Sequence, residues 1–127
     1  MIVVDTSALM AILLEEPEAR ACKAALETED EVLVSAGTLA EALVVAARRN
    51  VREAMAKLVD GLDFQIVAVS AASARRIGRA YEKWGKGRHR AGLNFGDCFA
   101  YALAKEQGCR LLYVGDDFSK TDIKAAL

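Results

Sequence analysis

The sequence predicts an α/β domain in which a central, mostly parallel sheet of four or five strands lies between two layers of helices. Short apolar runs of strand length recur four times along the chain, and segments with helical periodicity separate them. Parallel neighbours require crossover connections, so the intervening helices are expected to cover both faces of the sheet. The length of 127 residues suits one domain, and we expect a single domain over 1–127.

The elements expected in the first half of the chain are a strand at 2–4, helices at 7–14 and 17–27, a strand at 31–35 and a helix at 37–49. The first strand is an apolar run that stops abruptly at Asp5. Pro17 follows a break between the two helices and suits the first turn of the second one. In the helix at 37–49, Leu39, Leu43 and Ala46 give one apolar face.

The elements expected in the second half are helices at 51–61, 71–84 and 94–107 and strands at 64–69 and 111–114. Gly61 and Gly108 are plausible C-terminal stops, and Asn94 is a plausible N-cap. The helix at 71–84 is expected to bury an apolar stripe made of Ala74, Ile77, Tyr81 and Trp84.

Composition excludes several classes of protein. Apolar residues make up 54% and charged residues 28%, with one proline, so neither disorder nor a repeat is indicated. The longest apolar run after the first strand, 8–14, is too short to span a membrane, and no export signal is evident. Three cysteines without a Cys-x-x-Cys spacing and a single histidine indicate reduced thiols in a cytoplasm and disfavour zinc. Seventeen basic residues against 18 acidic ones predict no bulk affinity for polyanions.

Three solitary acids interrupt apolar stretches. Asp5 ends the first strand, Glu41 is the only charge in 32–47, and Asp97 is the only charge between Arg90 and Lys105. A buried carboxylate must be protonated, paired or bound to a metal ion, because its desolvation is costly. The alternative is helix capping, by Asp5 in one helix and by Asn94 with Asp97 in another.

A fourth acidic position follows the last predicted strand, where Asp116 and Asp117 stand in the same relation to the strand as Asp5 does to the first. In parallel sheets, ligands gather outside the carboxyl ends of the strands. We therefore expect these acids to share one edge of the sheet.

Basic residues gather in one region of the chain. Part of them repeats every four residues on the helix at 71–84, and the rest lies in a glycine-rich loop beside Tyr81 and Trp84. Cations beside aromatic rings suit an RNA backbone with exposed bases. The alternatives are a solvated helix face, which is the simpler explanation of the helical repeat taken alone, and an ordinary mobile loop. The candidate RNA-binding residues are Arg75, Arg79, Lys83, Lys86, Arg88 and Arg90.

Four stretches together resemble a known family. They are Val-Val-Asp-Thr-Ser-Ala at 3–8, Glu41 after the second strand, Leu-Asn-Phe-Gly-Asp-Cys at 93–98 and Gly-Asp-Asp-Phe-Ser-Lys-Thr-Asp-Ile at 115–123. In order and spacing the chain resembles a PIN-domain ribonuclease of the VapC toxin type. This resemblance implies a three-layer PIN-like fold, an Mg²⁺-dependent endoribonuclease with Mn²⁺ as a possible substitute, an RNA substrate, a cognate VapB-type antitoxin and a homodimer.

The resemblance also implies roles for the acids. Asp5 and Asp97 become the principal metal ligands, and Glu41 becomes a ligand or an orienter of the attacking water. Many relatives carry Asp-x-Asp-Phe after the last strand, whereas Gly115 occupies the first acidic place here. Asp116 or Asp117 must then supply the fourth acid. Ser7 and Asn94 are expected to support the ligands, with helix capping as the alternative.

Two other functions compete with this one. A haloacid-dehalogenase type of phosphotransferase also begins with a strand that ends in Asp, but it needs a second Asp where Ser7 stands. A non-catalytic PIN-like module could instead bind RNA or a protein, although without a cation its clustered acids would repel one another. For the antitoxin, some of four apolar side chains are expected to line a groove, with core packing as the alternative; they are Leu9, Leu13, Met55 and Leu58.

Overall fold

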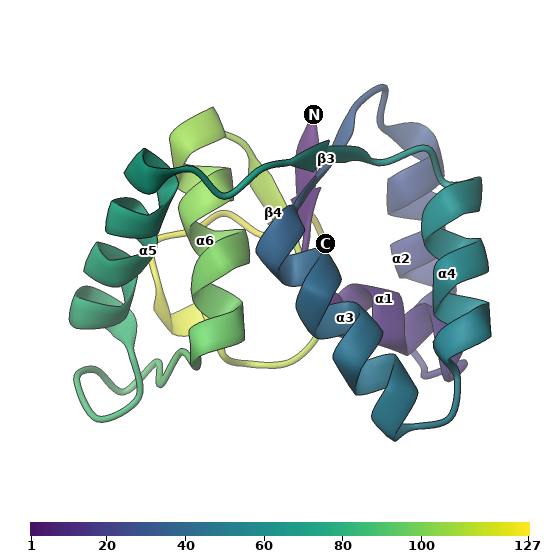
Figure 1. The fold of residues 1–127 in the computed structure, drawn as a ribbon, viewed down its shortest axis with the longest axis horizontal. Coiled ribbons are helices and arrows are strands. Elements are labelled where there is room, and N and C mark those ends of the chain that lie inside the picture. The colour runs from purple at the N-terminus through teal and green to yellow at the C-terminus, as the bar shows by residue number, and fades with distance from the viewer.

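The computed structural model describes residues 1–127 and contains one four-stranded sheet with helices on both faces (Figure 1). The strands are β1 (Ile2–Val4), β2 (Val32–Ser35), β3 (Gln65–Val67) and β4 (Arg110–Leu112), in the spatial order β3-β2-β1-β4. Every pairing is parallel. The predicted α/β class with a parallel sheet of four strands is confirmed.

The helices follow the predicted order. They are α1 (Thr6–Leu13), α2 (Ala19–Thr28), α3 (Ala36–Arg48), α4 (Arg52–Gly61), α5 (Ala71–Trp84) and α6 (Phe95–Gln107), with a 3₁₀ turn η1 (Phe118–Lys120). Most helix ends agree with the prediction within one or two residues, and α2 begins two residues after Pro17. None of these helices combines the length and apolar character that crossing a membrane would require.

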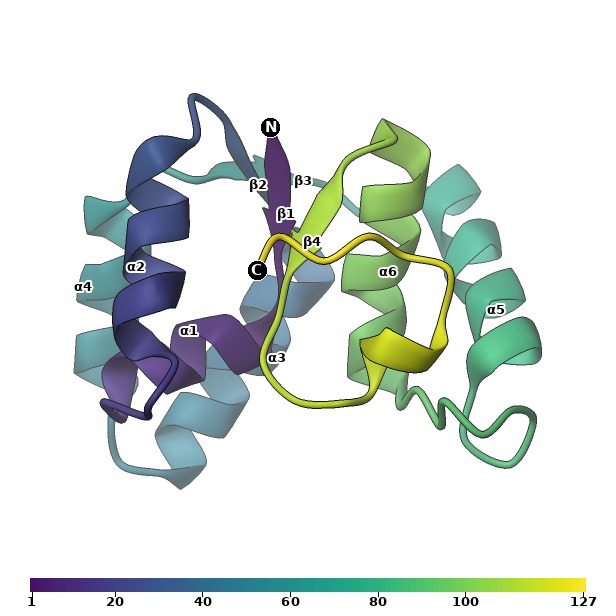
Figure 2. The same ribbon diagram turned by 180° about the vertical axis from the view of Figure 1, so that it is seen from behind.

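The strands divide the interior into two cores. Ile2 and Val4 of β1 face the core that α1, α2, α3 and α4 close, whereas Val3 faces the core that α5 and α6 close. In Figures 1 and 2 these two sets of helices lie on opposite sides of the narrow sheet. Because both faces of β1 and β2 are buried, these strands are continuously apolar rather than alternating.

Two predicted burial patterns are only partly correct. In helix α5, Ile77 and Trp84 of the expected stripe pack against the second core, but Ala74 and Tyr81 are exposed and Ala80 is buried instead, because the helix turns the 77/80 face toward α6. Strand β3 is one of the two edge strands of the sheet, and Ile66 is 52% exposed there. The expected cover of helices on both faces therefore does not extend to this edge.

The apolar side chains expected to line a partner groove belong largely to the first core. Leu9 and Met55 are fully buried, and Leu13 and Leu58 are partly buried against the same cluster. For Leu9 and Met55 core packing is the correct interpretation, because their side chains are inaccessible to a partner.

The C-terminal segment folds back along the sheet after β4. The chain turns at Gly115, whose φ is 102°, passes through η1 and returns to β4, where the backbone of Leu111 bonds to Lys124 and Ala126. Figure 2 shows this segment in yellow, crossing α6 before it reaches the C-terminus beside β1 and β4. We name residues 115–123 the C-terminal strap.

Candidate active site

Asp5 occupies the carboxyl end of β1 and caps α1 at the same time. Its Oδ2 accepts hydrogen bonds from the Ser7 backbone N (3.0 Å) and from Ser7 Oγ (2.7 Å). Its Oδ1 is buried and has no hydrogen-bond partner, and the residue is 2% exposed. Burial raises the pKa of Asp5 to about 7, and the charges of Asp97 and Glu41 add to the effect against the opposing bonds from Ser7.

Ser7 joins two parts of the site. Besides donating to Asp5, its Oγ accepts a hydrogen bond of 3.0 Å from the backbone N of Val114, where the chain leaves β4. The strand that precedes the acids at 116 and 117 is therefore tied to the first acid. Ser7 therefore bridges Asp5 and the end of β4, and its supporting role toward a ligand stays a prediction.

Asp97 is also both a capping residue and a member of the site. Asn94 Oδ1 accepts from the Asp97 backbone N (2.8 Å), and Asp97 Oδ2 accepts from the Asn94 backbone N (3.0 Å). Asp97 is 8% exposed, and burial raises its pKa to about 6 against the opposing hydrogen bond from Asn94; the charges of Asp117 and Glu41 add smaller upward contributions. Capping uses one carboxylate oxygen and leaves the other free of protein hydrogen bonds.

Glu41 reaches the site from the second turn of α3. The Thr6 hydroxyl lies 2.7 Å from Glu41 Oε1 and 3.3 Å from the carbonyl of Thr38, so its single proton favours Glu41. The carboxylate also lies directly against Gly96, because a Cβ at that position would stand 1.8 Å from Glu41 Oε2. The absence of a side chain at Gly96 therefore brings Glu41 next to the helix turn that carries Asp97.

The two acids after β4 are not equivalent. Both Asp116 and Asp117 are exposed on the C-terminal strap. The charge of Asp117 contributes to the raised pKa of Asp97, whereas Asp116 has no such effect on Asp97. Asp116 instead uses its backbone carbonyl, which accepts from the N and Oγ of Ser119 (3.2 and 2.6 Å).

The acidic cluster has no cationic partner within the protein. None of its five acids takes part in any of the ion pairs of the chain. The two buried side-chain oxygens without a hydrogen-bond partner are Asp5 Oδ1 and Thr38 Oγ1, on residues that flank and contact Thr6. A bound cation would reduce the repulsion between the carboxylates and would give the buried Oδ1 of Asp5 a partner.

The donor chemistry of this cluster fits a hard divalent ion, since every side-chain donor is an oxygen. No three carboxylates, and no other three Asp, Glu, His or Cys side chains, lie close enough together to form a ready-made metal site. Mg²⁺ does not require such a cage, because it retains several waters and binds through one or two carboxylates. The cluster therefore suits an ion held mostly by water and substrate.

The predicted RNA-binding residues lie on the α5 side of the molecule. All six are exposed, and none forms an ion pair. Arg79 and Lys83 line a groove of about 330 Å³ between α5 and α6 together with Trp84. The loop before α6 is held by backbone hydrogen bonds, including Lys86 N to the carbonyl of Leu93.

Sequence reasoning missed three contributors to this site. Thr6 and Gly96 act through contacts between distant segments, and only their positions beside Asp5 and Asp97 could have drawn attention to them. Phe95 begins α6 beside Gly96 and is 71% exposed, with its ring edge-on to Phe99 at 4.9 Å between centroids. An apolar residue within an apolar stretch gives no sequence signal of such exposure.

Comparison with known proteins places nearly the whole chain in one family. The PIN domain family model matches residues 2–124. The VapC ribonuclease Mb0640 of Mycobacterium bovis is 46% identical over 126 residues, which cover 95% of each chain. The ribonuclease VapC of Mycolicibacterium smegmatis is 41% identical over 126 residues, covering 97% of this chain and 98% of the relative.

Two solved structures share the fold. The Mycobacterium tuberculosis toxin VapC20, described as cleaving the sarcin-ricin loop, superposes with a TM-score of 0.74 at 22% identity, covering 97% of this chain and 96% of that one. A toxin-antitoxin complex from Klebsiella pneumoniae contains a chain that superposes with a TM-score of 0.70 at 21% identity, covering 96% and 93%. At these identities the likeness establishes the fold.

Proposed function

This chain belongs to the PIN-domain family, among the VapC ribonucleases, and we propose that it is a divalent-metal-dependent endoribonuclease acting as the toxin of a toxin-antitoxin pair. The proposal rests mainly on the cluster around Asp5. The buried Oδ1 of Asp5 has no hydrogen-bond partner, and the charges of two further acids, Asp97 and Glu41, act on the same carboxyl group. A non-catalytic binding module would have no use for acids that destabilise one another.

The residues Asp5 and Asp97 would hold Mg²⁺, or Mn²⁺ in its place, and Glu41 would bind it or orient the attacking water. When bound, such an ion activates water and stabilises the oxyanions formed at the phosphate. Thr6 fixes one oxygen of Glu41 and leaves the other to face α6. Between the two acids of the strap, we assign the fourth position to Asp117, because its charge acts on Asp97.

We further propose that RNA enters along the basic side of the molecule. The six candidate RNA-binding residues are free to contact phosphates, because none of them is paired with an acid; the basic residue of α5 that is paired, with Glu106, is Arg76. The exposed ring of Phe95, two residues before Asp97, offers a surface on which a base can stack. Phosphate contacts would position the strand, and stacking would bring one base beside the acids.

The partner is proposed to be a VapB-type antitoxin, and the active form a homodimer in the cytoplasm. The support is family membership, together with three free thiols that suit a reducing compartment. A basic side chain of the antitoxin, directed at the acidic cluster, would pair with the same carboxylates that would otherwise bind the metal ion, and would thereby inhibit the enzyme.

The decisive experiment incubates the purified protein with total RNA, with EDTA, Mg²⁺ or Mn²⁺, and maps the new RNA ends. We expect cleavage with a divalent ion, none in EDTA, and none for Asp5→Asn or Asp97→Asn. These variants remove charge with little change of size. Full cleavage by either variant, or by the wild type in EDTA, would contradict the proposed site.

A further inference from the structure

The C-terminal strap is attached at its beginning to the first acid of the site. Val114, the residue before the strap, donates its backbone N–H to Ser7 Oγ at 3.0 Å, and the same Oγ donates to Asp5 Oδ2 at 2.7 Å. The position at which the strap leaves the sheet is therefore coupled to Asp5 by two hydrogen bonds.

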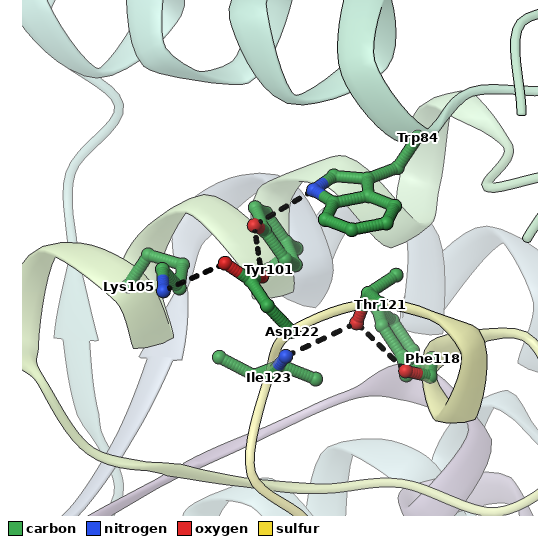
Figure 3. A network of polar contacts seen from close by, with 7 residues as sticks. All are labelled: Trp84, Tyr101, Lys105, Phe118, Thr121, Asp122 and Ile123. Atoms are coloured by element: carbon green, nitrogen blue, oxygen red, sulfur yellow. Dashed lines mark hydrogen bonds and ion pairs between the residues drawn. The ribbon is translucent and has the colours of Figure 1, made fainter.

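The other end of the strap is attached to the helix that carries Asp97 (Figure 3). Asp122 Oδ1 accepts a hydrogen bond of 2.5 Å from Tyr101 Oη, which in turn accepts one of 2.8 Å from Trp84 Nε1. Tyr101 is buried in α6, four residues after Asp97, so the two side chains lie one above the other on the same helix face. Lys105, a further turn along this face, pairs with Asp122 Oδ2 at 3.1 Å.

The direction of the central bond follows from its surroundings. Burial and the bond to Asp122 raise the pKa of Tyr101, so the phenol keeps its proton and donates. Partial burial opposes ionisation of Asp122, but the hydrogen bonds from Tyr101 and Lys105 outweigh it and lower the pKa of that carboxyl. A neutral donor thus meets a charged acceptor, which makes a stronger bond than a neutral pair.

Between its two attachments the strap is compact. Phe118 is buried against Tyr113, with ring centroids 5.1 Å apart. Thr121 Oγ donates to the carbonyl of Phe118 at 2.7 Å and accepts from the backbone N of Ile123 at 3.2 Å (Figure 3). A segment this short and internally bonded transmits the position of its ends to Asp117.

We propose that Tyr101 and Asp122 are positioning residues that hold the C-terminal strap, and with it Asp117, in place on α6, the helix that carries Asp97. The hydrogen bond from Trp84 also links Tyr101 to the glycine-rich loop at 85–94, since Trp84 packs edge-on against His89 of that loop with ring centroids 4.8 Å apart. This inference rests on the proposed nuclease function for its catalytic consequence. The attachment of the strap itself does not depend on that function.

The variants separate this hydrogen bond from its neighbours. Tyr101→Phe removes the hydroxyl, so that Trp84 Nε1 loses its acceptor and Asp122 Oδ1 loses its donor while Lys105 still pairs with Oδ2. Asp122→Ala removes the acceptor. Asp122→Asn keeps an amide oxygen that can accept from Tyr101 and serves as the conservative rescue. Lys105→Met is the matched control, because it removes only the exposed ion pair to the same carboxylate.

The catalytic test measures kcat and KM on an RNA that the wild type cleaves. Tyr101→Phe and Asp122→Ala are expected to lower kcat about 10- to 100-fold with KM within about twofold, since misplacing a group by ~1 Å can cost about 10²-fold. Asp122→Asn and Lys105→Met should stay within about threefold of the wild type. Asp117→Asn should cost far less in the Tyr101→Phe background than in the wild type, because both changes disable the same group.

A second test needs neither RNA nor metal. In EDTA, trypsin should cut after Lys120 and Lys124 of Tyr101→Phe and Asp122→Ala at least about tenfold faster than in the wild type, at temperatures well below each variant's Tm. Lys105→Met should be cut in this region at the wild-type rate. Strap opening is then measured apart from global unfolding.

The outcomes are distinct. Wild-type kcat in Tyr101→Phe, or an undiminished effect of Asp117→Asn in that background, overturns the positioning role. Unchanged trypsin cleavage of both variants overturns the attachment. A wild type that cleaves no RNA under any ion refutes the proposed function instead, and the trypsin rates then decide the attachment alone.

Discussion

Asp5 shows how one residue can satisfy both interpretations of its sequence context. Its Oδ2 caps α1, as the capping alternative requires, and its Oδ1 remains buried without a partner. Asp97 likewise uses one oxygen for capping, and its other oxygen accepts no hydrogen bond from the protein. A cap fixes the orientation of a carboxylate, so capping at these positions is compatible with the metal-binding role that we propose for these acids.

The metal-free protein should become less stable as pH rises. The pKa of Asp5 is about 7 in the folded chain against an ordinary value of 3.8, so the folded state holds the extra proton between these values. The stabilisation that Asp5 contributes is fully present below about pH 4, is lost progressively between about pH 4 and pH 7, and does not change further above that. At ~1.4 kcal/mol per pH unit, the total loss in the free energy of unfolding is a few kcal/mol.

Urea unfolding in EDTA at pH 4 to 8 measures this effect. Asp5→Asn should be more stable than the wild type at pH 8 and nearly equal to it at pH 4. Some dependence on pH should remain in the variant, because the pKa of Asp97 is also raised, to about 6. Parallel stability curves for the two proteins would show that Asp5 is not the titrating group.

Gly96 gives a prediction about a contact between α3 and α6. Gly96→Ala places a methyl group where the Glu41 carboxylate lies, so Glu41 must leave Gly96 and the Thr6 hydroxyl. We expect a loss of nuclease activity of about tenfold or more with a fold that is retained. The rate of RNA cleavage and the circular dichroism spectrum together measure this.

Gly78→Ala is the matched control, because Gly78 lies in the middle of α5 and a Cβ there would meet nothing within 4 Å. It should stabilise the protein by about 0.5–1 kcal/mol and leave activity unchanged. Equal nuclease activities of Gly96→Ala and Gly78→Ala would show that the position of Glu41 does not matter for RNA cleavage.

The helices and strands were largely predictable from sequence, for reasons that differ between elements. Strands β1 and β2 are buried on both faces, so they appear as uninterrupted apolar runs, and α6 carries both an N-cap at Asn94 and a left-handed stop at Gly108. The apolar side of α5 was predictable from its segregated apolar and charged residues, but the exact buried face was not, because Ala74, Ala80 and Tyr81 all lie near Ile77 on that side. Its contact with α6 selects the face that is buried.

The loop before α6 leads to a prediction about RNA binding. Gly87 and Gly92 adopt positive φ (84° and 63°), so the glycines shape a hydrogen-bonded loop that presents Arg88 and Arg90 to solvent. Replacing both arginines with alanine should weaken RNA binding and lower the slope of log affinity against log salt by about one to two units, at ~0.7 per single-strand phosphate contact.

The measurement is a salt series of RNA affinities in EDTA, where no cleavage is expected. The control replaces Arg20 and Lys23, which are exposed on α2 on the other side of the sheet, and should leave the slope unchanged (Figure 1). A slope that falls equally in both double variants would indicate a general effect of net charge instead of a binding site.

Assembly of the site is a property of the whole chain. The acids come from segments as distant as Asp5 and Asp117, and the parallel order β3-β2-β1-β4 brings the carboxyl ends of the central strands to one edge. The sequence could therefore nominate the acids from their isolation in apolar runs. It could not reveal that Gly96 admits Glu41 or that Tyr101 holds Asp122, since these contacts depend on how α6 packs against α3 and the strap.

A divalent ion should consequently stabilise the whole fold, and more strongly at high pH. An ion that binds only the folded state stabilises it by about 2.7 kcal/mol at 100 times its Kd. At pH 8 Asp5 and Asp97 are ionised and ready to bind, whereas at pH 5.5 the ion must displace the protons that their raised pKa values of about 7 and about 6 retain. Thermal unfolding with Mg²⁺ and with EDTA should show a rise in Tm of several degrees at pH 8 and a much smaller one at pH 5.5. Asp5→Asn combined with Asp97→Asn should abolish the rise at both values. A rise of equal size at both pH values, or one that survives in the double variant, would place the ion elsewhere on the molecule.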